Sequence, residues 1–329
     1  MANSGRECSA AEISKEKGPP RRPEFEALWR LNQSCNYRCE YCFRSGVDEY
    51  RQAEHPECGK YRPTQIAKAF DDTGKIWRIH MTGGEPFLYP DFVSLAKALT
   101  ARHHISINTN LSTSNVYDFA DQITPSSVHS INASLHLAER QKRKDGLERF
   151  IQCMLHLQKK GFNVRLMYIT YPPLLSRLKN DLTSFRSQGI SGIYVKVFRG
   201  RYENELYPAA FTKDQRALIL SAGIPGDERA ILQGETNFFG RQCVAGSKAF
   251  DIDISGNLTR CSAINKGYGN IFTGRYCFDE QASPCSSLFC NCPYQGLKFT
   301  QRKTYEVLSK LMRRTFDAFL PKSKQGTLR

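Results

Sequence analysis

The sequence lacks the two features that direct a chain into or across a membrane. Its 329 residues contain no run of about eighteen apolar residues, the length that a membrane-spanning helix needs. The segment Met1–Pro20 is polar and charged, without the apolar core of a signal peptide. We therefore expect a cytoplasmic protein, in which the twelve cysteines are thiols or metal ligands and not disulfides.

A nucleic-acid-binding motif is also missing, although the net charge is +15. Nine Lys or Arg residues and only two acids fall in residues 298–329, so much of the excess lies near the carboxyl end. We expect a helix at Thr304–Leu320 there, with a solvated basic face. No aromatic stacking platform accompanies the basic residues, as a nucleic-acid-binding module would ordinarily show. An anionic small substrate or an acidic electron donor would explain the positive charge equally well.

Three cysteines close together are the most informative feature that is present. Cys35, Cys39 and Cys42 form a C-x3-C-x2-C run directly after a predicted strand at Phe25–Leu31. Three thiolates can hold three irons of a [4Fe-4S] cluster and leave the fourth iron open to a ligand from outside the protein. A zinc loop or a disulfide knot is the alternative, but zinc needs a fourth protein ligand and only Cys58 lies near in sequence.

This spacing, with the aromatic Tyr41 before the third cysteine, resembles the cluster loop of the radical S-adenosylmethionine (SAM) enzymes. A second matching motif, Gly83-Gly84-Glu85, follows the apolar stretch Ile76–Ile79. In that family such a motif holds the amino group of SAM. The resemblance implies a SAM-binding [4Fe-4S] cluster, reductive cleavage of SAM to a 5'-deoxyadenosyl radical, and abstraction of a hydrogen atom from a substrate.

Strands and helices alternate after these motifs, which is typical of a parallel sheet. Besides Phe25–Leu31, the predicted strands are Trp77–Met81, His104–Thr109, Val128–Leu135, Val164–Thr170 and Ile193–Phe198. The predicted helices between them are Thr64–Asp71, Asp91–Ala101, Leu147–Lys160 and Leu174–Gln188. With the family resemblance, we expect an α/β fold: a partial (βα)6 TIM-like barrel, whose chemistry gathers at the carboxyl ends of the strands.

Polar residues at those strand ends are the candidates for binding and catalysis. By resemblance, we expect contacts with SAM or substrate from Asn108, Asn110 and Ser134. His136 is the candidate acid, base or substrate anchor, because imidazole titrates near neutrality. For an anionic substrate group we expect three cations near the last strand: Lys196, Arg199 and Arg201. The alternative is that the polar groups are satisfied locally and that the two arginines are simply exposed.

A second group of cysteines follows the predicted barrel. Cys243 and Cys261 stand in a C-x12-G-x4-C pattern around a predicted β-hairpin, and three more cysteines follow: Cys285, Cys290 and Cys292. The pattern resembles the SPASM/Twitch extension of radical SAM enzymes, which implies one auxiliary [4Fe-4S] cluster. Five cysteines compete for at most four ligand places, and a structural zinc is the alternative. The remaining cysteines are expected to be ordinary thiols: Cys8, Cys58, Cys153 and Cys277.

The expected chain organisation has five parts. They are a polar extension at 1–24, the barrel at 25–205, a linker with a helix at 206–237, the SPASM/Twitch domain at 238–297, and a basic helix and tail at 298–329. Only residues 1–24 precede the first predicted strand, which favours a small substrate over a ribosomal peptide with its own recognition domain.

We therefore predict a radical SAM oxidoreductase or epimerase of natural product biosynthesis, acting on a small anionic sugar, cyclitol or nucleotide conjugate. Its electron donor would be of the flavodoxin or ferredoxin type. One alternative is a leader-independent peptide maturase that epimerises or cross-links its substrate. The other is a non-catalytic zinc- or RNA-binding protein.

Overall fold

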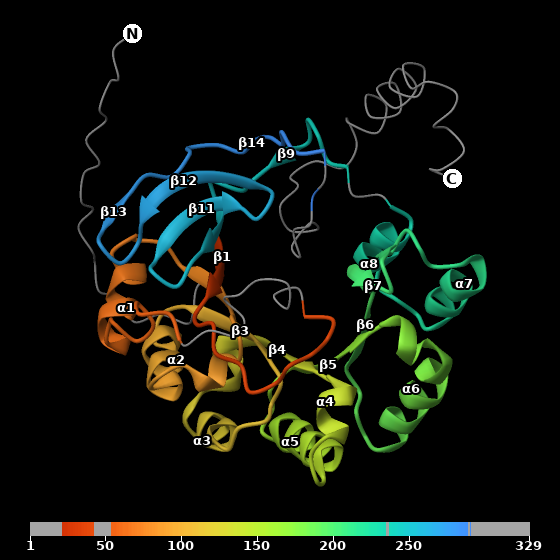
Figure 1. The fold of residues 1–329 in the computed structure, drawn as a ribbon. Coiled ribbons are helices and arrows are strands. Elements are labelled where there is room, and N and C mark those ends of the chain that lie inside the picture. Colours follow the sequence, from red (N-terminus) through yellow and green to blue (C-terminus); the bar gives the residue numbers. More distant parts are fainter. Residues whose placement is uncertain (1–21, 43–53, 235–236, 289, 291–329) are drawn as a thin grey trace, which may run out of the picture.

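Six parallel strands form the centre of the computed structural model, which describes residues 22–42, 54–234, 237–288 and 290 (Figure 1). The strands are β1 (Phe25–Arg30), β2 (Trp77–Thr82), β3 (His104–Thr109), β4 (Val128–Ser134), β5 (Val164–Ile169) and β6 (Ile193–Lys196). Each strand pairs with the next one along the chain. All six lie where the sequence predicts strands, because apolar runs bounded by turn residues mark strands of a buried sheet.

Helices follow the strands and cover one face of the sheet (Figure 1). They are α1 (Pro63–Asp71), α2 (Phe92–Thr100), α3 (Asn115–Gln122), α4 (Leu137–Gln141), α5 (Gly146–Lys159) and α6 (Leu178–Ser187), with 3-10 helices at Pro86–Leu88, Pro125–Ser127 and Pro172–Arg177. α3 and α4 are not among the predicted helices. The helix predicted at Leu174–Gln188 begins as the 3-10 helix, since consecutive prolines at its start restrict the backbone.

Alternation along the strands separates an apolar outer face from a polar inner face. Trp29 and Ile79 on the outer face are fully buried, and the Trp29 ring lies 5.9 Å from the ring of Phe70 in α1. Glu26 and His80 alternate with these residues and therefore point to the other side of the same strands, away from α1. The apolar core therefore lies between sheet and helices, and the concave side of the barrel is left for polar chemistry.

The C-terminal strands extend the same sheet. β10 (Ala249–Ile252) pairs in parallel with β1, and β11 (Asn257–Cys261), β12 (Ile264–Asn270) and β13 (Arg275–Tyr276) follow in antiparallel order. The complete sheet has ten strands in the order β13-β12-β11-β10-β1-β2-β3-β4-β5-β6. The predicted hairpin is present, and it continues the barrel sheet. Its turn requires Gly256, whose φ is +87° and whose Cβ would lie 2.3 Å from the Phe272 ring.

Smaller elements complete the described residues. β7 (Gly200–Tyr202) pairs with β8 (Glu205–Tyr207), and β9 (Gln242–Cys243) pairs with β14 (Ser283–Pro284). Helices α7 (Lys213–Ser221) and α8 (Gly226–Leu232) occupy the predicted linker. No helix of the residues described is both long and apolar enough to cross a membrane. The predicted helix at Thr304–Leu320, together with Cys8 and Cys292, lies outside the described residues.

Candidate functional site

The cysteine loop leaves the carboxyl end of β1. The amide N–H of Tyr37 donates a hydrogen bond to the Cys35 sulfur at 3.4 Å, and the N–H of Cys42 donates to the Cys39 carbonyl at 3.1 Å. Burial, followed by the charge of Glu139 and of the other two thiols, raises the pKa of Cys39 to about 12. The three thiols therefore lie within electrostatic reach of one another, and metal binding would have to drive their ionisation.

The glycine motif after β2 packs against the start of this loop. The Gly84 N–H donates to the Asn32 carbonyl at 3.1 Å, and the Glu85 N–H donates to the Ser34 carbonyl at 2.8 Å. A Cβ at Gly83 would lie 2.3 Å from Asn32 Oδ1, and one at Gly84 would lie 2.0 Å from the Ser34 carbonyl oxygen. Contact with the cysteine loop thus requires glycine at both positions. Their contact with the SAM amino group stays a prediction.

The Glu85 side chain joins the loops that follow β2 and β3. Its carboxylate accepts hydrogen bonds from the Phe87 N–H at 3.1 Å, the Thr109 hydroxyl at 2.6 Å and the Asn110 N–H at 2.6 Å. The residue is 1% exposed, and this burial raises its pKa to about 7. Glu85 is therefore tied to the protein by its side chain, and any contact with SAM would come from its backbone.

The two asparagines predicted after β3 have different neighbours. Asn110 is buried, and its side-chain N–H donates to Asn36 Oδ1 at 2.9 Å while lying 4.0 Å from the Cys35 sulfur. Asn108 lies on the inner face, where its side-chain Oδ1 accepts a hydrogen bond from Asn132 Nδ2 at 2.8 Å. Asn110 consequently supports the cysteine loop, whereas Asn108 belongs to the wall of the barrel.

His136 follows β4 in a left-handed conformation, with φ of 44°, and precedes α4. Its Nδ1 lies 3.0 Å from the Tyr41 hydroxyl, and the two rings stack with centroids 5.8 Å apart. Burial and the nearby Arg140 charge lower the pKa of His136 to about 4. A ring with this low a pKa is neutral at pH 7 and a weak base, so the contact suits the orientation of Tyr41 better than proton transfer. Its catalytic role stays a prediction.

A buried arginine that the sequence did not single out connects these elements. The Arg140 guanidinium donates to the carbonyls of Leu135 at 2.5 Å, Asn110 at 2.5 Å and Ser134 at 3.0 Å. It also donates to the Tyr37 hydroxyl at 3.1 Å. Ser134 thus meets this site through its carbonyl, and its predicted contact with SAM or substrate is untested. The sequence does not indicate that Arg140 is buried, because this residue stands in a run of charged residues typical of a solvent-exposed helix face.

The three cations predicted for substrate lie near the end of β6. Lys196 is half-buried there, and burial, with the Arg199 charge as a smaller cause, lowers its pKa. Arg199 forms an ion pair with the buried carboxylate of Glu228 at 3.3 Å. Arg201 is exposed on β7. Because Arg199 already has a protein partner, its predicted role in clamping an anion together with Arg201 has no support from these contacts and stays a prediction.

The inner face also carries a hydrogen-bonded group that the sequence analysis did not identify. Glu26 forms an ion pair with Arg78, at 2.9 Å, and a hydrogen bond with His80. The other nitrogen of His80 contacts the Ser106 hydroxyl at 2.5 Å. The sequence signal for this group was the alternation of Glu26, Arg78 and His80 with apolar residues in their strands. The group thus links β1, β2 and β3 through side-chain contacts, and two of its members, His80 and Ser106, are buried.

Three cysteines of the second group lie together in the structure. Cys243 and Cys285 are buried in one small cluster, and Cys261 packs against it. Backbone hydrogen bonds hold the segment, with the Gly240 N–H donating to the Cys285 carbonyl at 2.7 Å. Cys290 is also buried. These positions are compatible with ligands of one metal group.

The three remaining cysteines in the described residues have separate surroundings. Cys153 is buried on α5, Cys58 is half-buried and Cys277 is exposed. Burial raises the pKa of both Cys153 and Cys58 to about 12, as expected of inert thiols. Within the described parts of the chain, no three His, Cys, Asp or Glu side chains are arranged around a single metal ion. A cluster takes one thiolate per iron, so its ligands need not meet at one point.

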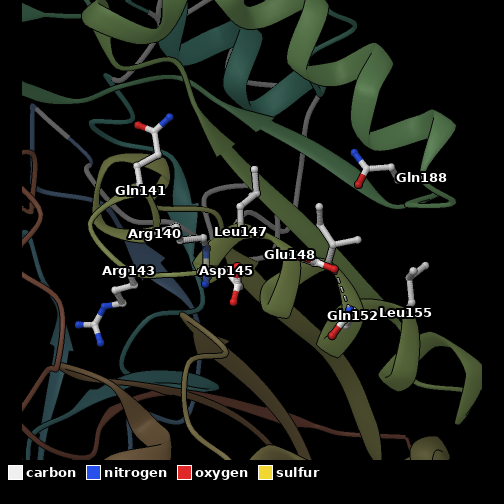
Figure 2. A pocket seen from close by; sticks show the side chains of 11 residues that line it. Arg140, Gln141, Arg143, Asp145, Leu147, Glu148, Gln152, Leu155 and Gln188 are labelled. Carbon is white, nitrogen blue, oxygen red and sulfur yellow. Dashed lines mark hydrogen bonds between the residues drawn. The ribbon is translucent and has the colours of Figure 1, made fainter.

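A pocket of about 650 Å³ lies outside the barrel along α5. Figure 2 shows Arg140, Gln141 and Arg143 at one end and Leu155 with Gln188 at the other. None of the site residues predicted from the sequence lines it. We therefore place the chemistry at the carboxyl ends of the strands and assign no ligand to this pocket.

Parallel strands β1 to β6 with a three-cysteine loop after β1 are the arrangement that the sequence predicts for a partial barrel with a cluster loop. Residues 29–176 match the radical SAM superfamily, so the chain contains a radical SAM domain. That domain implies a [4Fe-4S] cluster and SAM as cofactors. The residues fit the cluster: Tyr37 and Asn110 direct N–H groups toward Cys35, and hydrogen bonds to sulfur suit ligating thiolates.

Curated relatives share only part of this chain. The GTP 3',8-cyclase of Haemophilus influenzae (strain PittGG) is 34% identical over 83 residues, which are 25% of this chain and 24% of the relative. The probable GTP 3',8-cyclase of Thermococcus kodakarensis is 26% identical over 136 residues, 40% of this chain and 43% of the relative. The match thus spans less than half the length of these relatives.

Solved structures extend the likeness over more of the fold. Native anSMEcpe with bound AdoMet has a TM-score of 0.54 at 15% identity, and the match covers 75% of this chain and 78% of that one. Streptococcus suis SuiB has a TM-score of 0.54 at 16% identity, covering 76% of this chain and 63% of that one. At these identities the likeness supports the fold alone.

Proposed function

We propose that this protein is a radical SAM enzyme that takes a hydrogen atom from a small anionic substrate and oxidises or epimerises it with help from one auxiliary [4Fe-4S] cluster. When bound, the first cluster supplies the electron that splits SAM into methionine and a 5'-deoxyadenosyl radical. Cys35, Cys39 and Cys42 hold this cluster in the proposal. The barrel positions the substrate against SAM and keeps water away from the reacting atoms.

Two cations on the inner face carry the proposal for an anionic substrate. Arg165 lies beside Asn132, and Lys196 lies beside Ile169, so both stand on the polar wall of the barrel. Both are half-buried, and neither forms an ion pair with a described residue. The charge of the buried Glu228 acts on Lys196, but its carboxylate already forms an ion pair with Arg199 and accepts a hydrogen bond from the Val197 N–H. Partly desolvated cations without a carboxylate partner favour an anionic ligand.

The second cysteine group supports the auxiliary cluster. Cys243, Cys261 and Cys285 lie in one cluster, and the fourth ligand would come from Cys290 or Cys292. Because β10 and β11 extend the sheet from β1, this group is attached to the same scaffold as the SAM site. An auxiliary cluster there would accept an electron from the substrate radical, whereas a spare thiol would return a hydrogen atom and give epimerisation.

The comparisons favour a nucleotide among the anionic candidates. The curated relatives are GTP cyclases by name, and GTP is a small polyanion. A peptide maturase is the second candidate, because SuiB has been solved bound to its precursor peptide SuiA and has a TM-score of 0.53 to this chain. That structure is 17% identical, so it adds a substrate class to test and carries less weight than the cations on the inner face.

Anaerobic reconstitution followed by product analysis tests the proposal. About eight irons per chain with matching sulfide are expected for two [4Fe-4S] clusters, whereas zinc without sulfide would refute the enzyme assignment. Nucleoside triphosphates, sugar phosphates and peptides are then compared as substrates with SAM and dithionite in deuterated water. Deuterium at a product carbon indicates hydrogen return by a thiol, and its absence favours oxidation.

A charge-neutralising pair of variants tests the substrate class once an anionic substrate is found. Lys196→Gln should raise KM more than it lowers kcat, since it removes binding shared by ground and transition state. Lys97→Gln removes an equal charge from the exposed face of α2 and should change neither constant. Equal effects of the two substitutions, or activity on a peptide only, would refute the small-anion proposal.

A further inference from the structure

Arg140 is a buried cation without a carboxylate partner among the described residues. Its side chain is 1% exposed, and the positive end lies 3.7 Å from the centroid of the Phe150 ring. Arg140 forms no ion pair with a described residue. Arg78 and Arg199, which are only partly buried, each pair with a glutamate. The charge of the buried Glu85 acts on Arg140 without pairing directly with it, and because a buried charge without a direct partner is costly, a further anion nearby would stabilise it.

The geometry excludes a role as a flexible substrate ligand. Four hydrogen bonds fix the guanidinium, to the carbonyls of Leu135, Asn110 and Ser134 and to the Tyr37 hydroxyl. A guanidinium has only five N–H donors, so one remains. The charge is therefore held in one place, with no freedom to turn toward the inside of the barrel.

This fixed charge lies against the cysteine loop from two directions. Tyr37, which accepts a hydrogen bond from Arg140, stands between Cys35 and Cys39. Asn110, whose carbonyl accepts another, places its side chain 4.0 Å from the Cys35 sulfur. Thiolates that ligate a [4Fe-4S] core give the cluster a net negative charge, and each added electron increases it. A cluster on this loop would therefore bring negative charge to the side of the loop that Arg140 contacts through Tyr37 and Asn110.

We propose that Arg140 is the buried counter-charge of the cluster bound by Cys35, Cys39 and Cys42, and that its field makes this cluster easier to reduce. The inference rests on the proposed cluster site and assigns the source of its reduction potential. A fixed positive charge at low dielectric stabilises the reduced form, which carries more negative charge, more than the oxidised form. The one electron itself comes from an external reductant, and no bond of the protein changes.

Equilibrium redox titration of the reconstituted protein without SAM, followed by electron paramagnetic resonance of the reduced cluster, tests the proposal. Arg140→Gln should give a more negative midpoint potential than the wild type. Arg140→Lys keeps the charge and should stay closer to the wild type. Lys142→Gln is the matched control: its charge acts on Cys39, but its side chain is 62% exposed, paired with Glu139 and screened by solvent, so its shift should be much smaller.

A further variant keeps the test decisive if Arg140→Gln fails to hold iron. Glu85 is a buried acid whose charge acts on Cys35 with the opposite sign, so Glu85→Gln should make the potential more positive at pH 8.5. An unchanged potential in Arg140→Gln, an equal shift in Lys142→Gln, or no upward shift in Glu85→Gln would overturn the proposal. Failure of the wild type to bind a cluster would instead refute the cluster site on which the inference rests.

Discussion

Gly84→Ala is the smallest change that should separate the cysteine loop from the barrel. A Cβ at this position would lie 2.0 Å from the Ser34 carbonyl oxygen and 2.5 Å from the Gln33 carbonyl oxygen, where ordinary contacts begin at 3.4 Å. Both neighbours are backbone atoms, so they cannot rotate aside, and the two segments must move apart by roughly 1.4 Å. That movement would break the Gly84–Asn32 and Glu85–Ser34 hydrogen bonds, which measure 3.1 and 2.8 Å.

The expected cost follows from these losses. Overpacking costs about 1–3 kcal/mol and each lost hydrogen bond about 1 kcal/mol, so the free energy of unfolding should fall by about 3–5 kcal/mol. Urea unfolding of the reduced apoprotein measures this, and iron content after reconstitution should fall with it. Gly267→Ala is the control, because nothing lies within 4 Å of a Cβ there, and its effect should stay within about 0.5 kcal/mol. Wild-type stability and iron content in Gly84→Ala would refute the reasoning.

The metal ligands and the buried acid give three further tests. Changing Cys35, Cys39 and Cys42 together to Ala should leave a folded protein that makes no 5'-deoxyadenosine, and SAM cleavage by this variant would contradict the radical SAM assignment. Cys261→Ala should lose about half of the iron and stop product formation while some SAM cleavage continues; unchanged iron would show that the second cysteine group binds no cluster. Burial raises the pKa of Glu85 from 4.5 to about 7, so its contribution to apoprotein stability is fully present below pH 4.5 and is lost as the pH rises through 7. The loss is about 3 kcal/mol, Glu85→Gln should abolish it, and equal pH slopes in urea unfolding would contradict the assignment.

The barrel strands were predictable because their signal is local. Each is a short apolar run bounded by turn residues, and β3 begins and ends at the predicted residues His104 and Thr109. The pairing of β10 with β1 was not predictable in the same way, since no pattern within either segment specifies a partner more than two hundred residues away. The hairpin was therefore predicted correctly, and its attachment to the barrel sheet was not.

The candidate site shows the same division. The cysteine spacing and the Gly-Gly-Glu motif are contiguous in sequence, and the structure places them in contact. Arg140 could not be identified, because it stands beside Lys142 and Arg143 in a charged run whose members look alike in sequence. Only tertiary packing distinguishes them, burying the first and leaving the other two exposed. Motifs that are contiguous in sequence thus give candidate cluster ligands, while the charge that surrounds them depends on the fold.

Hydrogen bonds between the cysteine loop and the loops after β2 and β3 also couple the order of this loop to the stability of the barrel. Gly84 and Glu85 hold its beginning through the backbone, while Asn110 and Arg140 hold its middle through Asn36 and Tyr37. Glu85 in turn accepts the N–H of Asn110, so the loops after β1, β2 and β3 form one hydrogen-bonded unit. A ligand that orders any of these loops lowers the entropy cost of ordering the others. Cluster binding should therefore raise the stability of the loops after β1, β2 and β3 together, which urea unfolding of the apoprotein and of the reconstituted protein would measure.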